Sequence, residues 1–176
     1  MHLQKLLPAI EFVGEPTGDS VFLRAMETKD ETEVARIRKM GRITIEVVTQ
    51  VRDFLTACEV RDDEVLLKED GSPLTVGDVH SKIHLWVAER GAELPSGFIF
   101  AQGHDAGVPH SGGTPEDLMK LGQTIVFDIY PAEKGGGYYY DFTRNWCLGY
   151  ATPEAQELFN HVNEIYDTLN DNCDLN

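Results

Sequence analysis

Hydrophobic and polar positions between residues 124 and 146 form two strand-like runs on either side of a glycine-rich break. Residues 125–130 and 138–142 are rich in β-branched and aromatic types, which favour a pleated strand. Residues 134–137 supply the permissive backbone that a turn requires. The pattern therefore predicts a β-hairpin.

Each predicted strand carries one aspartate. Side chains alternate across a strand, so Asp128 shares a face with Val126 and Tyr130, and Asp141 shares a face with Thr143. Residues directly opposite each other in antiparallel strands have Cβ atoms roughly 4.5 to 5.5 Å apart, where two like charges are unfavourable unless a cation or a proton lies between them. The hairpin therefore predicts one or two divalent metal ions, with solvated carboxylates at strand ends as the alternative.

Elsewhere apolar residues recur every three or four positions and predict three helices. The first begins at Thr28, which has Glu31 three residues on as its capping-box partner, and runs to about residue 57. The other two cover about residues 75–90 and 152–170. Short strands are expected at residues 65–67 and 97–101.

A long loop at residues 102–122 carries His104 and His110, and loops of this length inside a compact domain are usually functional. His80 and His84 lie one helical turn apart, a spacing known from zinc sites, but HSKIH lacks the glutamate of an HExxH motif. We therefore expect these two histidines on an exposed helix face.

Composition narrows the classes of function. The chain has 176 residues, 41% of them hydrophobic, which is enough for one domain with a core. Its 30 acidic and 15 basic residues give a net charge of −15, which argues against binding nucleic acid or an anionic membrane. Three cysteines without CxxC spacing indicate free thiols, and the N-terminus has no signal-like or membrane-spanning stretch. These features predict a cytoplasmic protein.

The order of motifs resembles a known family. His110 in AGVPHSGG, then VFDIY around Asp128, then DFTR from Asp141, with Gly149 downstream, is similar to the pita-bread metallopeptidases. These are the relatives of Xaa-Pro aminopeptidase, Xaa-Pro dipeptidase (prolidase), methionine aminopeptidase and creatinase. The PH and DFTR details resemble the proline-specific branch, and the resemblance covers about residues 25–176.

This resemblance implies an α+β fold, the first half of a pita-bread fold, with long helices packed on an antiparallel sheet. It also implies two divalent ions, manganese above all and cobalt or zinc as alternatives, that share a bridging water or hydroxide. Asp128 would bind one ion through both oxygens and Asp141 would bridge the two. His110 would donate a hydrogen bond to the substrate carbonyl or to the tetrahedral intermediate, and Thr143 would hold Asp141 in place.

The function implied is that of a metal-dependent exopeptidase of the Xaa-Pro aminopeptidase or dipeptidase type, which hydrolyses the bond before a proline in the second position of a peptide. The family completes its site with one histidine and two glutamates downstream, whereas this sequence ends at Asn176. We therefore expect residues 1–25 to be a lead-in and residues 26–176 to be an incomplete, inactive half domain. Its expected partners are the missing C-terminal half and a second copy in a homodimer.

Two features depart from the family pattern. Twelve residues separate Asp128 from Asp141, slightly more than is usual, and Gln123 stands where an aspartate is frequent. Two other functions therefore stay open: a non-catalytic pita-bread module that binds peptides or proteins, and a creatinase-like metal-free carbon–nitrogen hydrolase. Retention of both aspartates argues against both, because a site without metal gains nothing from their repulsion.

Overall fold

The computed structural model describes residues 5–11, 14 and 20–171. The chain divides into two units, residues 1–36 and 37–176. In the first unit, helix α2 (Val21–Glu27) begins after Ser20, whose hydroxyl accepts a 3.1 Å hydrogen bond from the Phe22 amide. The sequence pattern of residues 1–25 predicted a lead-in and not this helix.

The N-terminal cap of the long helix α3 (Glu31–Ala57) lies at Asp30, two residues later than the capping pattern suggested. Asp30 and Glu33 exchange hydrogen bonds of 2.8 Å between side chain and backbone in both directions, so they form the capping box. The expected pair Thr28 and Glu31 was therefore wrong, because Thr28 instead ends α2 as its C-cap residue.

Helix α4 (Val76–Glu89) confirms the second predicted helix. Thr75 and Asp78 cap it through reciprocal hydrogen bonds of 3.0 and 3.1 Å, and Gly91 follows its end with a φ of 71°. A left-handed residue after a helix is usually glycine, since it has no Cβ to clash. The third predicted helix is α5 (Pro153–Asp171).

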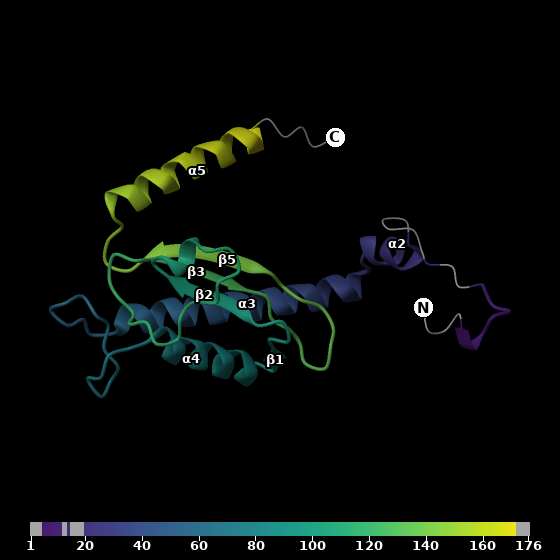
Figure 1. The fold of residues 1–176 in the computed structure, drawn as a ribbon, viewed down its shortest axis with the longest axis horizontal. Coiled ribbons are helices and arrows are strands. Elements are labelled where there is room, and N and C mark those ends of the chain that lie inside the picture. The colour runs from purple at the N-terminus through teal and green to yellow at the C-terminus, as the bar shows by residue number, and fades with distance from the viewer. Residues whose placement is uncertain (1–4, 12–13, 15–19, 172–176) are drawn as a thin grey trace. The chain divides into compact units, whose positions relative to one another are not determined.

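The main sheet has three antiparallel strands in the order β2 (Phe98–Gln102), β3 (Thr124–Ile129) and β5 (Phe142–Cys147). A second, two-stranded sheet pairs β1 (Ala92–Glu93) with β4 (Ala132–Glu133). Residues 65–67 take part only in isolated β-bridges, one of them between Val65 and Lys120. Figure 1 shows α3 and α4 running beside the sheet.

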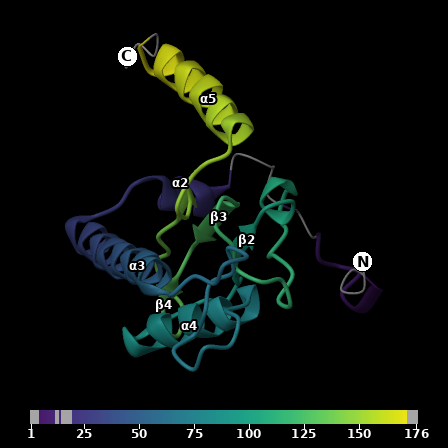
Figure 2. The same ribbon diagram turned by 90° about the vertical axis from the view of Figure 1, so that its left-hand side faces the viewer.

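One face of the sheet packs against α3 and α4, as the view in Figure 2 shows. Alternate residues of β3 are buried on this face, and the Phe100 and Phe127 rings meet edge to face with their centroids 5.5 Å apart. Each such fully buried side chain contributes about 1.5 to 3 kcal/mol to folding. The completely buried members of this core include Val47, Val51, Val79, Ile83, Phe100, Ile125, Phe127 and Ile129.

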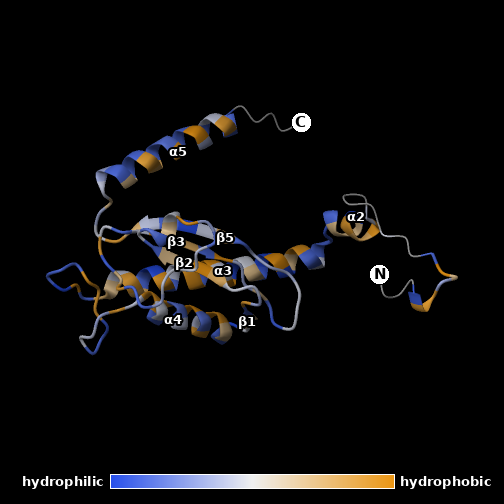
Figure 3. Ribbon diagram, in the orientation of Figure 1, coloured by the Kyte–Doolittle hydropathy of each residue, from blue (hydrophilic) through white to orange (hydrophobic). Residues whose placement is uncertain are grey.

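Helix α5 differs from the other two long helices because none of its residues is buried. Apolar and polar residues alternate along it with a helical period, as the colours in Figure 3 show. Its large apolar side chains are more than half exposed (Leu158, Phe159, Val162, Ile165, Tyr166 and Leu169). Among the described residues, no helix is both long enough and apolar enough to cross a membrane.

The predicted hairpin is present only in part. The pair β3 and β5 is antiparallel as expected, but the second strand begins at Phe142 rather than near Tyr138. The chain leaves β3 after Ile129 and forms β4 against β1 before it returns, and Tyr139 pairs back with Ala132. This detour accounts for the long spacing between the two aspartates.

Candidate metal site

Asp128 lies near the end of β3, the central strand of the sheet, on the face that α3 and α4 do not cover. Its neighbours Phe127 and Ile129 point into the core, so strand alternation turns the Asp128 carboxylate the other way. Thr143 is its direct partner across β3 and β5, and the Thr143 hydroxyl donates a 2.7 Å hydrogen bond to Asp128 Oδ1. The expectation that Thr143 would hold Asp141 was wrong.

Asp141 immediately precedes β5, two residues before Thr143 and therefore on the same face. Continuing the observed register places Asp141 opposite Tyr130, diagonal to Asp128 and not directly opposite it as the hairpin pattern suggested. Diagonal neighbours in a sheet are still within reach of each other. The two aspartates thus lie together at the end of the β3–β5 pair.

The two carboxyl groups influence each other. Although Asp141 is exposed on one side, desolvation raises the pKa of its carboxyl above the ordinary value of 3.8. The negative charge of Asp128 and a hydrogen bond between the two carboxyl groups raise this pKa further. Two carboxylates this close need a proton or a cation between them.

Tyr140 fixes the backbone just before Asp141. Its amide donates a 3.2 Å hydrogen bond to the Pro131 carbonyl, and its ring packs on Gly41 of α3. A Cβ atom added to Gly41 would lie 2.8 Å from Tyr140 Cε2, closer than real Cβ contacts allow. Nothing in the sequence pattern linked Gly41 to Tyr140, so this contact was not predicted. Its one signal was a glycine inside a strongly periodic helix.

His110 lies in the predicted loop, is exposed, and has a φ of 61°. Left-handed backbone is uncommon for residues other than glycine, and such strained positions cluster at functional sites. Gly113 lets this loop pass against β2, since an added Cβ would lie 2.7 Å from the Phe100 carbonyl oxygen. The hydrogen bonds of the described residues do not join His110 to either aspartate, so its part in the site stays a prediction.

His80 and His84 pack against the sheet, and His104 is exposed. His80 was expected on an exposed helix face, but it is half-buried and its Nε2 lies 2.9 Å from the Phe100 carbonyl oxygen. The His80 and His84 rings both meet Phe98 edge to face, at 5.2 and 5.1 Å. His80 thus ties α4 to β2, and the expectation was wrong for this residue. His104 is 91% exposed beside Asp105.

The donor set at the aspartates fits a divalent cation in part. Two adjacent carboxylates are the hard oxygen ligands that Mn²⁺ and similar ions favour, and a cation would relieve their repulsion. Within residues 5–11, 14 and 20–171, however, no group of three or more His, Cys, Asp or Glu side chains is placed to hold a metal. Asp128 and Asp141 therefore form part of a coordination shell.

Comparison with known proteins identifies the family in which this pair of aspartates occurs. The family model described as metallopeptidase family M24 matches residues 35–174. The chain belongs to this family. A comparison with curated protein sequences gives no match.

Solved structures similar to this M24 chain share its fold at low sequence identity. The prolidase from Pyrococcus furiosus is 22% identical, with a TM-score of 0.63 over 82% of this chain and 38% of that one. The X-Pro aminopeptidase from Thermotoga maritima is 18% identical, with a TM-score of 0.64 over 93% and 41%. Aminopeptidase P from Escherichia coli is 24% identical, with a TM-score of 0.59 over 77% and 27%. These likenesses confirm the predicted α+β pita-bread fold, and the chain spans about two fifths or less of each of these structures.

Proposed function

We propose that this chain contributes Asp128 and Asp141 to the metal centre of an exopeptidase that hydrolyses the bond before a proline. The observation that carries the proposal is the position of the two carboxyl groups, which lie together on the uncovered face of the sheet, so that the charge of Asp128 raises the pKa of Asp141. Membership of the M24 family and the names of the similar structures, prolidase and aminopeptidase P, support this reaction and substrate class.

Each of the residues present would have a separate role in this reaction. Asp128 and Asp141 would hold one or two divalent cations, with manganese as the expected metal and cobalt or zinc as alternatives. When bound, such cations supply Lewis acidity that favours attack of water on a peptide carbonyl. The Thr143 hydroxyl holds Asp128 in one orientation through its 2.7 Å hydrogen bond.

His110 would act on the substrate. An imidazole N–H donated to the peptide oxygen stabilises the negative charge that grows there as water adds to the carbonyl. Its exposed position in the loop leaves the ring accessible to a peptide. We assign His110 the role of a hydrogen-bond donor in the transition state.

Two carboxylates are too few for a closed two-metal shell. The described part of the chain holds no three-residue ligand group, and the chain spans only 38% of the prolidase it resembles. We propose that the remaining ligands lie outside this sequence, in the second half of the catalytic domain. The chain alone would then bind metal weakly and cleave no peptide. The homodimer expected from the sequence stays a prediction.

A metal titration tests the first step of this proposal. Mn²⁺ added to the chain in a calorimeter should give weak binding that disappears in Asp128→Asn and in Asp141→Asn. Asp117→Asn is the matched control, because Asp117 is an exposed aspartate of the preceding loop. Binding that survives both site substitutions would place the metal elsewhere.

The substrate class is tested on the complete catalytic domain. An Xaa-Pro dipeptide should be cleaved in a metal-dependent way, and the matching Xaa-Ala dipeptide should not. Equal cleavage of both would rule out proline specificity. Cleavage of Xaa-Pro by the 176-residue chain alone, with two tightly bound metals, would overturn the view that the site is incomplete.

One observation favours a second candidate, a non-catalytic pita-bread module that binds a peptide or protein. It is the lack, within the described residues, of a third metal-ligating side chain beside the aspartates. The two candidates differ in their response to metal. A module of this kind would show no Mn²⁺ binding that depends on Asp128 and Asp141, even in the complete domain.

A further inference from the structure

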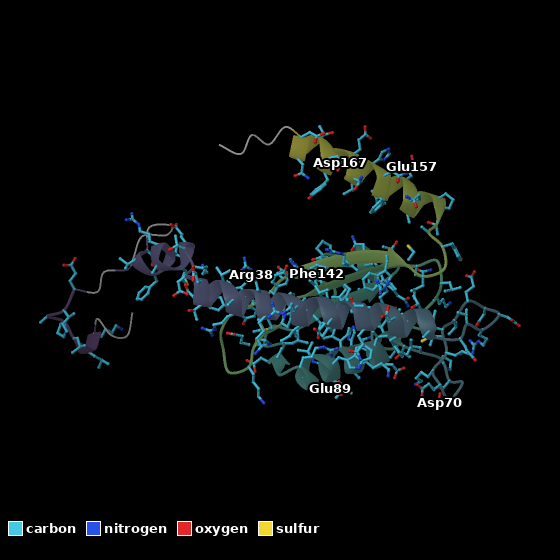
Figure 4. The ribbon with its side chains drawn as sticks, turned by 180° about the vertical axis from the view of Figure 1, so that it is seen from behind. Arg38, Asp70, Glu89, Phe142, Glu157 and Asp167 are labelled. Atoms are coloured by element: carbon cyan, nitrogen blue, oxygen red, sulfur yellow. The ribbon has the colours of Figure 1, made fainter. Side chains whose placement is uncertain are left out.

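Strand β5 presents different side chains to its two faces. Thr143 lies on the face of the two aspartates, whereas Phe142, Arg144 and Trp146 alternate onto the opposite face, toward α3. Figure 4 labels Phe142 at the start of this strand and Arg38 early in α3. The two sets of side chains thus belong to separate environments on opposite faces of one strand.

A cavity of about 250 Å³ lies between β5 and α3 on this second face. We call it the β5–α3 cavity. Its apolar wall includes Ile45, Val48 and Phe142, and its polar wall includes Arg52, Arg144 and Trp146. Ligand sites are typically apolar hollows with a few convergent polar groups, and this cavity is close to the lower end of their usual size, about 300 Å³.

Two guanidinium groups line this cavity in a protein whose net charge is −15. The Arg144 guanidinium carbon lies 3.7 Å from the centroid of the Phe142 ring, and its Nη1 donates a 2.7 Å hydrogen bond to the Thr143 carbonyl. Arg52 donates through Nε and Nη2 to one oxygen of Asp53, at 3.0 and 2.7 Å. A guanidinium has five N–H donors, so both groups retain donors beyond these bonds.

The third polar group is the Trp146 indole. Its Nε1 is buried and has no hydrogen-bond partner among the described residues. The ring borders the β5–α3 cavity, whereas the buried Nε1 itself is closed to it. Two guanidinium groups beside an apolar hollow call for a ligand with an acceptor at one end and an apolar body.

We propose that the β5–α3 cavity binds a small carboxylate with an aromatic or branched apolar body. The carboxylate would accept hydrogen bonds from Arg52 and Arg144, a geometry in which a guanidinium fork pairs both oxygens at once. Its negative charge would also relieve the repulsion between the two cations. The apolar body would cover Phe142, Ile45 and Val48. This site lies on the opposite side of the sheet from Asp128 and does not depend on the proposed peptidase reaction.

Trp146 provides a direct signal, because the chain has two tryptophans and therefore two indole N–H resonances. The chain labelled with ¹⁵N is titrated with 3-phenylpropionate, and Trp146→Phe assigns the two signals. We expect the Trp146 indole signal to move, because the ring borders the cavity that the ligand would fill. The Trp86 signal should stay in place, since Trp86 packs in the core beside Phe54.

Matched ligands and variants separate this site from a merely apolar hollow. The neutral amide, 3-phenylpropionamide, should bind to the parent chain at least about tenfold more weakly than the acid does. The acid should bind to Arg52→Gln or to Arg144→Gln at least about tenfold more weakly than to the parent chain. Arg38→Gln should bind like the parent chain, because Arg38 is an exposed arginine on the same helix about 21 Å away at 1.5 Å per residue. Both arginines of the cavity reach solvent, so their substitution should leave the fold intact, which the two indole signals report.

Five results would overturn the proposal. The first four are equal binding of the acid and the amide, unchanged binding in both arginine variants, movement of the Trp86 signal instead, and no movement up to about 20 mM acid, the limit of weak binding. The fifth concerns Phe159, which borders a separate cavity of about 300 Å³ together with Trp146. Binding lost in Phe159→Ala but kept in Arg52→Gln would place the ligand there and would also overturn the proposal.

Discussion

The Thr143 hydroxyl donates a 2.7 Å hydrogen bond to Asp128 Oδ1 from the directly opposite position of the neighbouring strand. The bond satisfies one lone pair of the carboxylate and fixes its plane. The Asp128 carboxylate lies on the same face of the sheet as Asp141. An ordinary cross-strand pair thus orients one of the two candidate metal ligands.

Replacing Thr143 with valine should weaken Mn²⁺ binding by about 10- to 100-fold, the usual effect of losing a group that orients a metal ligand. Valine keeps the shape and strand propensity of threonine, so the fold should not change. Calorimetric titration of the complete domain measures this effect. Thr56→Val, on the exposed side of α3, is the control, and equal losses in both variants would contradict the orienting role.

Asp141→Asn should make the metal-free chain slightly more stable at neutral pH. The pKa of the Asp141 carboxyl is raised in the folded state, so its stabilising contribution is complete below the unfolded value of 3.8 and is lost as pH rises through the folded pKa. Asparagine does not ionise, so the variant keeps the stability that the parent chain loses when Asp141 becomes charged. The gain should be about 0.5 kcal/mol at most, because solvent screens this exposed side chain, and should vanish below pH 3.8.

Asp63→Asn should change the free energy of unfolding in the opposite direction. Urea unfolding at several pH values measures this for both Asp63→Asn and Asp141→Asn. A hydrogen bond from Arg61 lowers the pKa of Asp63 to about 2, so its contribution is present above pH 3.8 and is lost as pH falls through 2. This variant should therefore be less stable than the parent at neutral pH. If both variants changed in the same direction with pH, the assignment of a raised pKa to Asp141 would fail.

His110→Ala in the complete domain should lower turnover by about 10²- to 10³-fold, the range for losing one donor to a developing oxyanion. Metal content should stay constant, because His110 is not assigned as a ligand. Steady-state kinetics with elemental analysis measures both. His104→Ala is the control, since His104 is a 91% exposed histidine of the same loop. A loss of metal in His110→Ala would make His110 a ligand.

Gly41→Ala should weaken metal binding from a distance. Alanine gains about 1 kcal/mol of helix propensity, but forcing a Cβ to 2.8 Å from the Tyr140 ring costs about 1 to 3 kcal/mol. We expect a net destabilisation of up to about 2 kcal/mol and a displaced Asp141. Urea unfolding and Mn²⁺ titration measure the two effects. Thr32→Ala, at an exposed position of α3, should show neither.

The parts of the fold that depend on local chemistry could be predicted from the sequence. The cap formed by Thr75 and Asp78 depends on a motif of four consecutive residues. Helix α5 could be predicted from the helical period of its apolar residues and from Pro153 at its start. The strand pairing of β3 with β5 also follows from residue type. Their exact register does not, because it depends on β4 pairing with β1, which lies some forty residues earlier.

In the candidate site, too, local motifs could be predicted from the sequence and contacts between distant elements could not. The motif around Asp128 and Asp141 indicates which residues act together, and the structure brings them to one face. The identity of the residue that Thr143 supports, the packing of Tyr140 on Gly41 and the burial of His80 all depend on contacts between distant elements. The β5–α3 cavity is of this kind too, since Arg52 and Arg144 belong to no common sequence motif.

The alternation of β5 makes the protein sensitive to the parity of insertions. One extra residue between Phe142 and Thr143 would turn every later side chain of the strand over, moving Arg144 to the carboxylate face and Thr143 toward α3. Two extra residues would restore the faces and only lengthen the strand. An insertion at residues 135–137, where three glycines connect β4 to β5, would be absorbed without any such inversion. Natural length variation should therefore accumulate at the glycines and be rare, or even in number, within β5.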